Sequence, residues 1–159
     1  MSRTIPLTQG FEALVSDQDY SYLMQWKWSY VKGRNGGYAK RHGARPNRNA
    51  IALHNVVAHR KGIHGEADHK NQDTLDNQRC NLRPATRSQN SMNRSRRRDN
   101  RSGYKGVDKN KGQWRARITK QGRTLHLGYF KTKKKAAAAY NAAAIRLHGE
   151  FSCLNRGVT

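Results

Sequence analysis

Four residues between positions 68 and 90 have side chains that could together hydrolyse a phosphodiester. Asp68 directly precedes His69, and asparagines follow at positions 81 and 90 in the segment DHKNQDTLDNQRCNLRPATRSQN. Such hydrolysis needs a base that deprotonates water and a positive charge that stabilises the leaving oxygen. His69 suits the base role, because an unperturbed imidazole titrates near pH ~6.5. A hard divalent cation prefers oxygen ligands, and Asp68 and Asn90 could supply them.

Each of these residues alone also has an ordinary structural interpretation. An Asp-His pair is weak evidence, because histidines more often pack or cap than catalyse. Asn81 could be a turn residue and Asn90 an exposed helical amide. The local pattern predicts a strand over 67–70, a loop over 71–81 and a second strand over 82–85. A helix follows, with Thr86 as its cap and Gln89 completing a capping box, so Asn90 falls in its first turns.

The charge of the chain indicates a polyanionic partner. The 159 residues include 32 Lys+Arg and 10 Asp+Glu, for a formal net charge of +22. Such an excess repels itself unless a polyanion binds, and nucleic acid is the favoured candidate over a ribosomal or membrane-surface role. Residues 1–93 carry 14 basic and 7 acidic side chains, and residues 94–159 carry 18 and 3. We therefore expect the second part to hold phosphates and the first to keep the acidic groups that a cation site needs.

Other classes of protein are disfavoured by the composition. There is no apolar run long enough to span a membrane and no secretory signal pattern at the start of the sequence. Cys80 and Cys153 lie far apart without CxxC spacing, which indicates neither a zinc knuckle nor a disulfide framework. We therefore expect a cytoplasmic protein that acts on DNA in a bacterial or phage-infected cell.

The segment 68–90 resembles the HNH nuclease motif, and its spacing is most similar to that of homing endonucleases of phage or bacterial type. The resemblance implies a ββα-metal unit in which Asp68 and Asn90 hold one Mg²⁺ or Mn²⁺ and His69 activates the water. It also implies that Asn81 braces the loop and helps to orient the base. Asn77 matches a common asparagine of the family, for which we favour a structural turn role.

His54 lies in LHNVVAH, at a position typical of the same family. It could contact the scissile phosphate, or it could simply pack within its helix. The elements before the motif are expected to be strands over 4–10 and 11–15 and a helix over 20–26 with a Ser16–Asp19 capping box. A hairpin around 33–37 and a helix from Leu53 to His59 that ends at Gly62 should follow.

The C-terminal part predicts three strands and one helix. The strands are expected over 104–110, 113–119 and 123–130, and the helix over 133–147, capped by Thr132 and closed by Gly149. The motifs SGYKGV, WRARI, LGYF and AAAAYNAAAIRLHG make residues 102–155 resemble the Apetala-two / ethylene-response-factor DNA-binding domain. In that family a three-stranded sheet enters the major groove and the helix backs it, which groove width allows.

Several polar residues of this part are candidates for DNA contact. By alternation, Arg115, Arg117 and Thr119 share one face of the second strand, opposite Trp114, Ala116 and Ile118. Thr124 and His126 share a face of the third strand, and Lys105 matches a contacting position of the resembled family. The departures at Asp108, Thr119, Thr124 and His126 mean that the plant target sequence does not carry over. Arg96, Arg97 and Arg98 of the basic linker are expected to meet phosphates or a narrow minor groove.

The sequence therefore predicts an α+β protein of two domains. Residues 1–93 form an HNH nuclease domain with a β-rich extension, 94–101 a basic linker, and 102–159 a three-stranded antiparallel sheet packed on one helix. The predicted function is a site-directed, metal-dependent DNA endonuclease, most similar to a homing endonuclease, with double-stranded DNA as partner and no small-molecule substrate. One site per chain favours nicking by a monomer, and a homodimer on DNA could cut both strands. The alternative is a non-catalytic, sequence-specific DNA-binding regulator with a decayed nuclease domain.

Overall fold

A computed structural model describes residues 1–33, 36–44, 46 and 48–158. The chain divides into two compact units, Met1–Thr86 and Arg87–Thr159. Each unit is a mixture of small antiparallel sheets and helices, in agreement with the predicted α+β class. No helix in the described part of the chain is long and apolar enough to cross a membrane.

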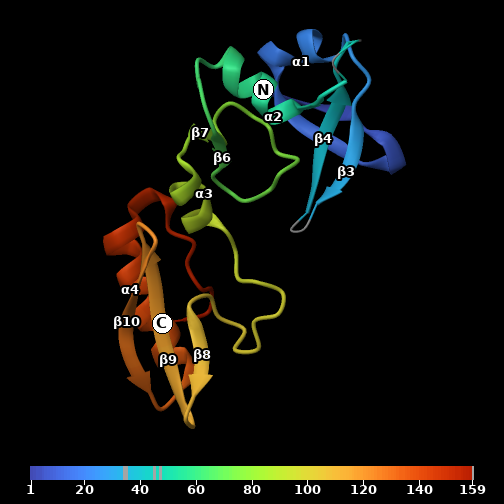
Figure 1. Cartoon of the computed structure of the whole chain (residues 1–159). Helices are drawn as coiled ribbons and strands as arrows, with labels where there is room; N and C mark the ends of the chain where they lie inside the picture. The colour runs from blue at the N-terminus through green and yellow to red at the C-terminus, as the bar shows by residue number, and fades with distance from the viewer. Residues whose placement is uncertain (34–35, 45, 47, 159) are drawn as a thin grey trace. The chain divides into compact units, whose positions relative to one another are not determined.

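The first unit contains seven strands and two α-helices among its described residues (Figure 1). In chain order its elements are β1 (Ser2–Pro6), η1 (Thr8–Gly10), β2 (Glu12–Ser16), α1 (Asp17–Leu23), β3 (Ser29–Gly33), β4 (Gly36–His42), β5 (Ala50–Ala52), α2 (Leu53–Arg60), β6 (Ala67–His69) and β7 (Leu82–Pro84). The strands pair as β1-β2, β3-β4-β5 and β6-β7. The predicted hairpin is present, and positions 34–35 at its tip lie outside the described residues.

One apolar core joins these small sheets. Its fully buried members come from β1, β2, α1, α2 and β7, and they include Ile5, Val15, Leu23, Leu53 and Leu82. None of the two- or three-stranded sheets could bury a core alone, so each depends on its neighbours in the unit. Leu82 belongs to this core, and it faces His69 in the β6-β7 ladder. The core therefore fixes the strand that pairs with the segment carrying Asp68 and His69.

Two expectations around the first helix are wrong. The first helix spans Asp17–Leu23, earlier than the predicted 20–26, and the Ser16 side chain makes no cap hydrogen bond to it. The Ser16 hydroxyl instead accepts a hydrogen bond from the backbone N–H of Arg79 at 2.9 Å. Asp19 is fully buried and ion-paired with Arg79 and Arg60 at 2.7 and 3.0 Å. Long-range partners thus take both side chains away from the predicted capping box.

The second unit consists of a three-stranded sheet backed by one long helix (Figure 1). Its elements are α3 (Arg87–Asn93), β8 (Val107–Asn110), β9 (Gln113–Lys120), β10 (Arg123–Phe130), α4 (Lys133–His148) and η2 (Gly149–Phe151). The strands are antiparallel in the order β10-β9-β8, and α4 packs small side chains such as Ala136 and Ala144 against Ala116 and Ile118. The Thr132 hydroxyl accepts from the Lys135 N–H at 3.2 Å, so the predicted helix cap is confirmed.

The predicted ββα-metal unit is divided between the two units. β6 and β7 pair antiparallel in the first unit, with Asp68 opposite Arg83 and His69 opposite Leu82. The helix that carries Asn90 is α3, which belongs to the second unit. The assembly of these three elements into one metal site stays a prediction, as do the domain bounds 1–93, 94–101 and 102–159.

Candidate functional site

The imidazole of His69 is oriented by Asn77, from the loop that joins β6 and β7. Asn77 Oδ1 lies 3.1 Å from His69 Nε2, and both side chains are buried. Asn77 Nδ2 donates to the Leu75 carbonyl at 3.0 Å, which fixes the amide so that its oxygen faces the ring. Because an amide oxygen only accepts, Nε2 of His69 carries the hydrogen. In the neutral ring the lone pair that can accept a proton from water is then on Nδ1.

Strand β2 holds the loop that carries Asn77. The Leu14 N–H donates to the Leu75 carbonyl at 2.8 Å, and the Asn77 N–H donates to the Leu14 carbonyl at 2.7 Å. These two bonds extend the β1-β2 hairpin by a short parallel bridge between Leu14 and Asp76. The β-rich extension therefore belongs to the same structural unit as His69 and determines the position of Asn77.

Asn81 makes its contacts inside the loop. Its Oδ1 accepts from the Asn71 N–H at 3.1 Å, and its Nδ2 donates to Asn71 Oδ1 and to the Asp76 carbonyl at 2.9 and 2.7 Å. Such contacts close the loop at its base. The hydrogen bond to the imidazole comes from Asn77, to which the sequence pattern assigned only a turn role.

Asp68 is tied to Arg83, its cross-strand partner. Arg83 Nη2 and Nε lie 2.8 and 3.0 Å from Asp68 Oδ2, and both side chains are at least nine-tenths buried. A buried carboxylate is stable only when it is paired and hydrogen-bonded. Sequence analysis missed Arg83, although its position opposite Asp68 follows once the register of the two predicted strands is fixed.

His54, on the first turn of α2, lies beside His69. The two ring centroids are 5.2 Å apart in an edge-to-face arrangement, and the Tyr38 ring lies 5.8 Å from His54 on another side. Burial, together with repulsion from the protonated forms of His69 and Lys40, lowers the pKa of His54 to about 4. Burial also lowers the pKa of His69, although the hydrogen bond to Asn77 and the Asp68 charge oppose this shift. Both rings are therefore neutral at pH 7.

Asp68 is the charged oxygen ligand that the sequence pattern predicts for a cation, and its Oδ2 already accepts two hydrogen bonds from Arg83. No group of three or more His, Cys, Asp or Glu side chains suited to a metal occurs among the described residues. A site built from one carboxylate and one amide would leave most coordination positions to water and to phosphate oxygens, as is common for Mg²⁺. Asn90 lies half-buried on α3 in the second unit, and its pairing with Asp68 stays a prediction.

One face of the second unit's sheet gathers the predicted DNA-contact residues. On β9, Arg117 and Thr119 are exposed, whereas Ala116 and Ile118 are buried against α4, as alternation predicts. The cross-strand partners on β10 are Thr124 opposite Thr119, His126 opposite Arg117 and Tyr129 opposite Arg115. The Thr119 and Thr124 hydroxyls lie 3.2 Å apart.

Tyr129 joins this face because of a β-bulge. The register shifts between His126 and Gly128, so Tyr129 rather than Gly128 lies opposite Arg115. Its side chain is 49% exposed, and its ring centroid is 4.7 Å from that of His126. Strict alternation could not place Tyr129, since a bulge inserts an extra residue that changes which face each side chain occupies.

The other predicted contacts are placed differently. Lys105 Nζ donates to the Met92 and Arg94 carbonyls and is largely withdrawn from solvent, which lowers the pKa of this amine. Arg96, Arg97 and Arg98 are exposed, and Arg97 is paired with Asp99 at 3.0 Å. Contacts of all these residues with DNA stay predictions.

Comparison with known proteins supports the nuclease interpretation in part. The chain is 36% identical over 89 residues to a protein of Acanthamoeba polyphaga mimivirus named as an uncharacterized HNH endonuclease. The alignment covers 56% of this chain and 46% of that relative, so the chain matches less than half of the relative's length. No family model matches the chain.

Proposed function

We propose that this protein is a site-directed DNA endonuclease that hydrolyses phosphodiester bonds with one divalent cation, in the manner of a homing endonuclease. The observation that carries the proposal is the Asn77–His69 contact, because it presents Nδ1 of a neutral imidazole as a base next to a carboxylate on the same strand. The similarity to a viral protein named as an HNH endonuclease adds independent support.

In the proposed reaction, Nδ1 of His69 takes a proton from the attacking water while the Nε2–H of His69 keeps donating to Asn77 Oδ1. This hydrogen bond to the Asn77 side chain holds the ring in one tautomer and one orientation during the proton transfer. Asp68 and Asn90 would hold Mg²⁺ or Mn²⁺, which when bound would stabilise negative charge on the phosphate and leaving oxygen. His54 would contact the phosphate as a neutral N–H donor, because its pKa of about 4 leaves it uncharged at pH 7.

The second unit is proposed to hold and select the duplex. The antiparallel three-stranded sheet, the helix that backs it and the exposed polar side chains of β9 support this proposal. The exposed arginines of the linker would add contacts to phosphates, which raise affinity without reading sequence. The exposed sheet face of the second unit would then read the duplex, while His69, Asp68 and Asn90 would cut it.

A cleavage assay with matched histidine variants tests the proposal. Purified protein is incubated with diverse duplex DNA, such as phage and host genomic fragments, with Mg²⁺ or with EDTA. We expect breaks only with the metal, and a loss of about 10²–10⁴-fold in the single-turnover rate for His69→Ala. His59→Ala is the control, because His59 is exposed on α2 and its ring meets only that of His64 among the described aromatic contacts.

Asp68→Ala should reduce cleavage more than Asn90→Ala, because it removes the charged ligand. Full activity of His69→Ala would refute the base assignment, and unchanged cleavage in excess EDTA would refute the metal mechanism. Specific DNA binding without any breaks would support the alternative, a regulator with a decayed nuclease domain.

A further inference from the structure

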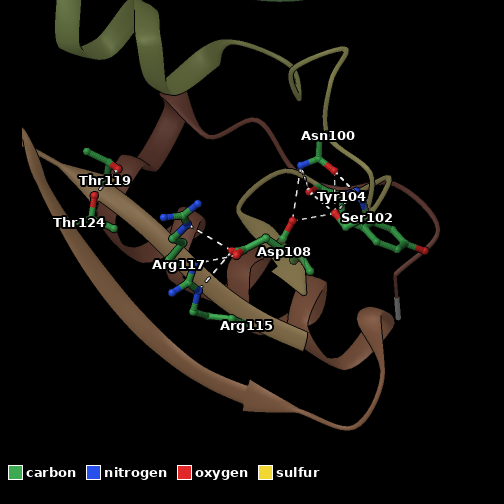
Figure 2. Close-up of polar contacts among 9 residues, drawn as sticks. Asn100, Ser102, Tyr104, Asp108, Arg115, Arg117, Thr119 and Thr124 are labelled. Atoms are coloured by element: carbon green, nitrogen blue, oxygen red, sulfur yellow. Dashed lines mark hydrogen bonds and ion pairs between the residues drawn. The ribbon is translucent and has the colours of Figure 1, made fainter. Parts of the chain in front are cut away.

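Asp108 bridges the two arginines at the centre of the exposed sheet face. It lies on β8 directly opposite Arg115 on β9. Its carboxylate meets Arg115 Nη2 at 2.7 Å and Nε at 3.4 Å, and it meets Arg117 Nε at 3.3 Å. Figure 2 shows both guanidinium groups directed at this one carboxylate. The Asp108 side chain is 33% exposed, so the bridge forms part of the accessible face.

This bridge has two consequences for what the arginines can bind. Two unpaired guanidiniums would attract phosphate oxygens, but a carboxylate between them removes one charge and repels a phosphate. Asp108 contacts the Nε of each guanidinium, and for Arg115 also Nη2. The edge of each guanidinium that lies between its two Nη atoms is not used by this carboxylate. A terminal guanidinium edge can donate two parallel hydrogen bonds to O6 and N7 of guanine.

The backbone that carries Asp108 is held firmly by the preceding turn. The Ser102 hydroxyl donates to the Val107 carbonyl at 2.7 Å, and Asn100 Oδ1 accepts from the Ser102 N–H at 2.9 Å. Asn100 Nδ2 also donates to the Tyr104 carbonyl at 2.9 Å, as the dashed network in Figure 2 shows. A rigid strand therefore places the carboxylate, and the carboxylate in turn limits the rotamers of both arginines.

We infer that Asp108 is a specificity-determining positioning residue, which holds Arg115 and Arg117 as a preorganised pair that reads guanine edges in duplex DNA. The inference rests on the proposed DNA-binding function of the second unit. Asp108 acts through the arginines, because its two oxygens are already engaged by them. The pair contributes selectivity by favouring base edges over phosphates, and preorganisation lowers the entropy lost when the arginines bind.

The test uses the full-length protein in EDTA, so that binding is measured without cutting. The preferred duplex is first selected from a randomised pool with wild-type protein. Dissociation constants are then measured by fluorescence anisotropy for that duplex and for duplexes in which each G·C pair is replaced by A·T. The variants are Asp108→Asn, which keeps the shape of the side chain and removes its charge, and Asp99→Asn as a matched control. Asp99 is likewise paired with an arginine, Arg97, but on the linker.

For Asp108→Asn we expect the preference for guanine at the affected positions to fall roughly tenfold. Binding to unrelated duplex should be equal or tighter, and the slope of log K against log salt should steepen by about 0.9 for each arginine that turns to a phosphate. Asp99→Asn should keep the wild-type discrimination. Asp108→Glu, which keeps the charge but moves it by one methylene, should weaken discrimination without steepening the slope.

The inference is overturned if Asp108→Asn, with a helix content equal to wild type by circular dichroism, keeps wild-type discrimination. It is also overturned if Asp108→Asn and the control Asp99→Asn lose discrimination equally, or if the wild type selects no guanine-containing site. If Asp108→Asn does not fold, the Asp108→Glu arm decides, and unchanged discrimination in that variant refutes the inference. The proposed nuclease activity fails separately, when selected DNA is bound specifically but is not cut with Mg²⁺.

Discussion

Acidification should destabilise the first unit through His54. The ring is held neutral by burial on α2 between Tyr38 and His69, with Lys40 adding repulsion, so its pKa falls to about 4. In the unfolded chain a histidine titrates near pH ~6.5. Because the folded pKa is the lower one, the unfolded state binds more protons as pH falls from about 6.5 to about 4. Stability is therefore complete above about pH 6.5 and decreases through that window.

The magnitude follows from the two pKa values. At pH 5 the unfolded histidine is almost fully protonated and the folded one is almost fully neutral. The difference in proton binding, integrated from neutral pH, lowers the free energy of unfolding by about 2 kcal/mol. His69 shifts in the same direction, so wild-type protein should lose more than this amount. His54→Gln removes the titrating group and should remove about 2 kcal/mol of the pH dependence.

Urea unfolding at pH 7.5 and pH 5.0, at one ionic strength, measures the effect. Tryptophan fluorescence in a Trp114→Phe background reports the first unit, because the two remaining tryptophans, Trp26 and Trp28, both lie there. The matched control is His59→Gln, which changes an exposed histidine of the same helix and should keep the wild-type pH dependence. If His54→Gln loses as much stability as wild type between the two pH values, the reasoning is refuted, whatever the variant's stability at pH 7.5.

Three further perturbations have defined outcomes. Arg83→Ala leaves the Asp68 carboxylate buried without this partner, so urea unfolding should show a loss of about 3–5 kcal/mol, partly restored by adding Asp68→Asn. A loss under about 1 kcal/mol, typical of exposed pairs, would contradict this. Asn77→Ala should lower the single-turnover cleavage rate about 10²-fold with unchanged DNA affinity, because the base loses its orientation; a change in affinity alone would contradict it. Replacing Arg96 by Ala should flatten the salt slope of DNA binding by about 0.9, and Arg97→Ala by less, because Asp99 already neutralises Arg97. If both variants and the wild type have equal salt slopes, the linker arginines do not contact phosphates and the segment acts only as a spacer.

The sequence predicted best those elements whose signals are local. The strands and helix of the second unit follow from glycine turns, alternation and the Thr132 cap, and all are present within a few residues of the expected positions. Gly112 and Gly122 both adopt positive φ, of 81° and 77°, which glycine tolerates and other residues rarely adopt. Where turn chemistry and hydrophobic period agree, the local sequence is enough to predict the element.

The failures occur where a distant part of the chain decides the outcome. The Ser16–Asp19 pattern reads as a capping box, yet its partners are Arg79 and Arg60, which lie 41 to 63 residues away. Strand β5 was not predicted, because three residues, Ala50–Ala52, carry no measurable period and pair only once β4 is in place. A local sequence pattern contains no information about such distant partners. Tertiary contacts can therefore override the local propensity on which the prediction rests.

The candidate catalytic site also depends on distant parts of the chain. Asp68 and His69 could be chosen from residue type and spacing, but the residues that orient them could not. Several contacts place Asn77 beside His69, and one of them is the pairing of the loop backbone with Leu14 of the distant strand β2. A change in β2 that removes the Leu14 N–H would therefore act on the imidazole without touching it. The N-terminal hairpin in this sense supports the proposed catalytic site, since it helps to position Asn77, whose amide oxygen accepts from Nε2 and so favours the tautomer with the lone pair on Nδ1.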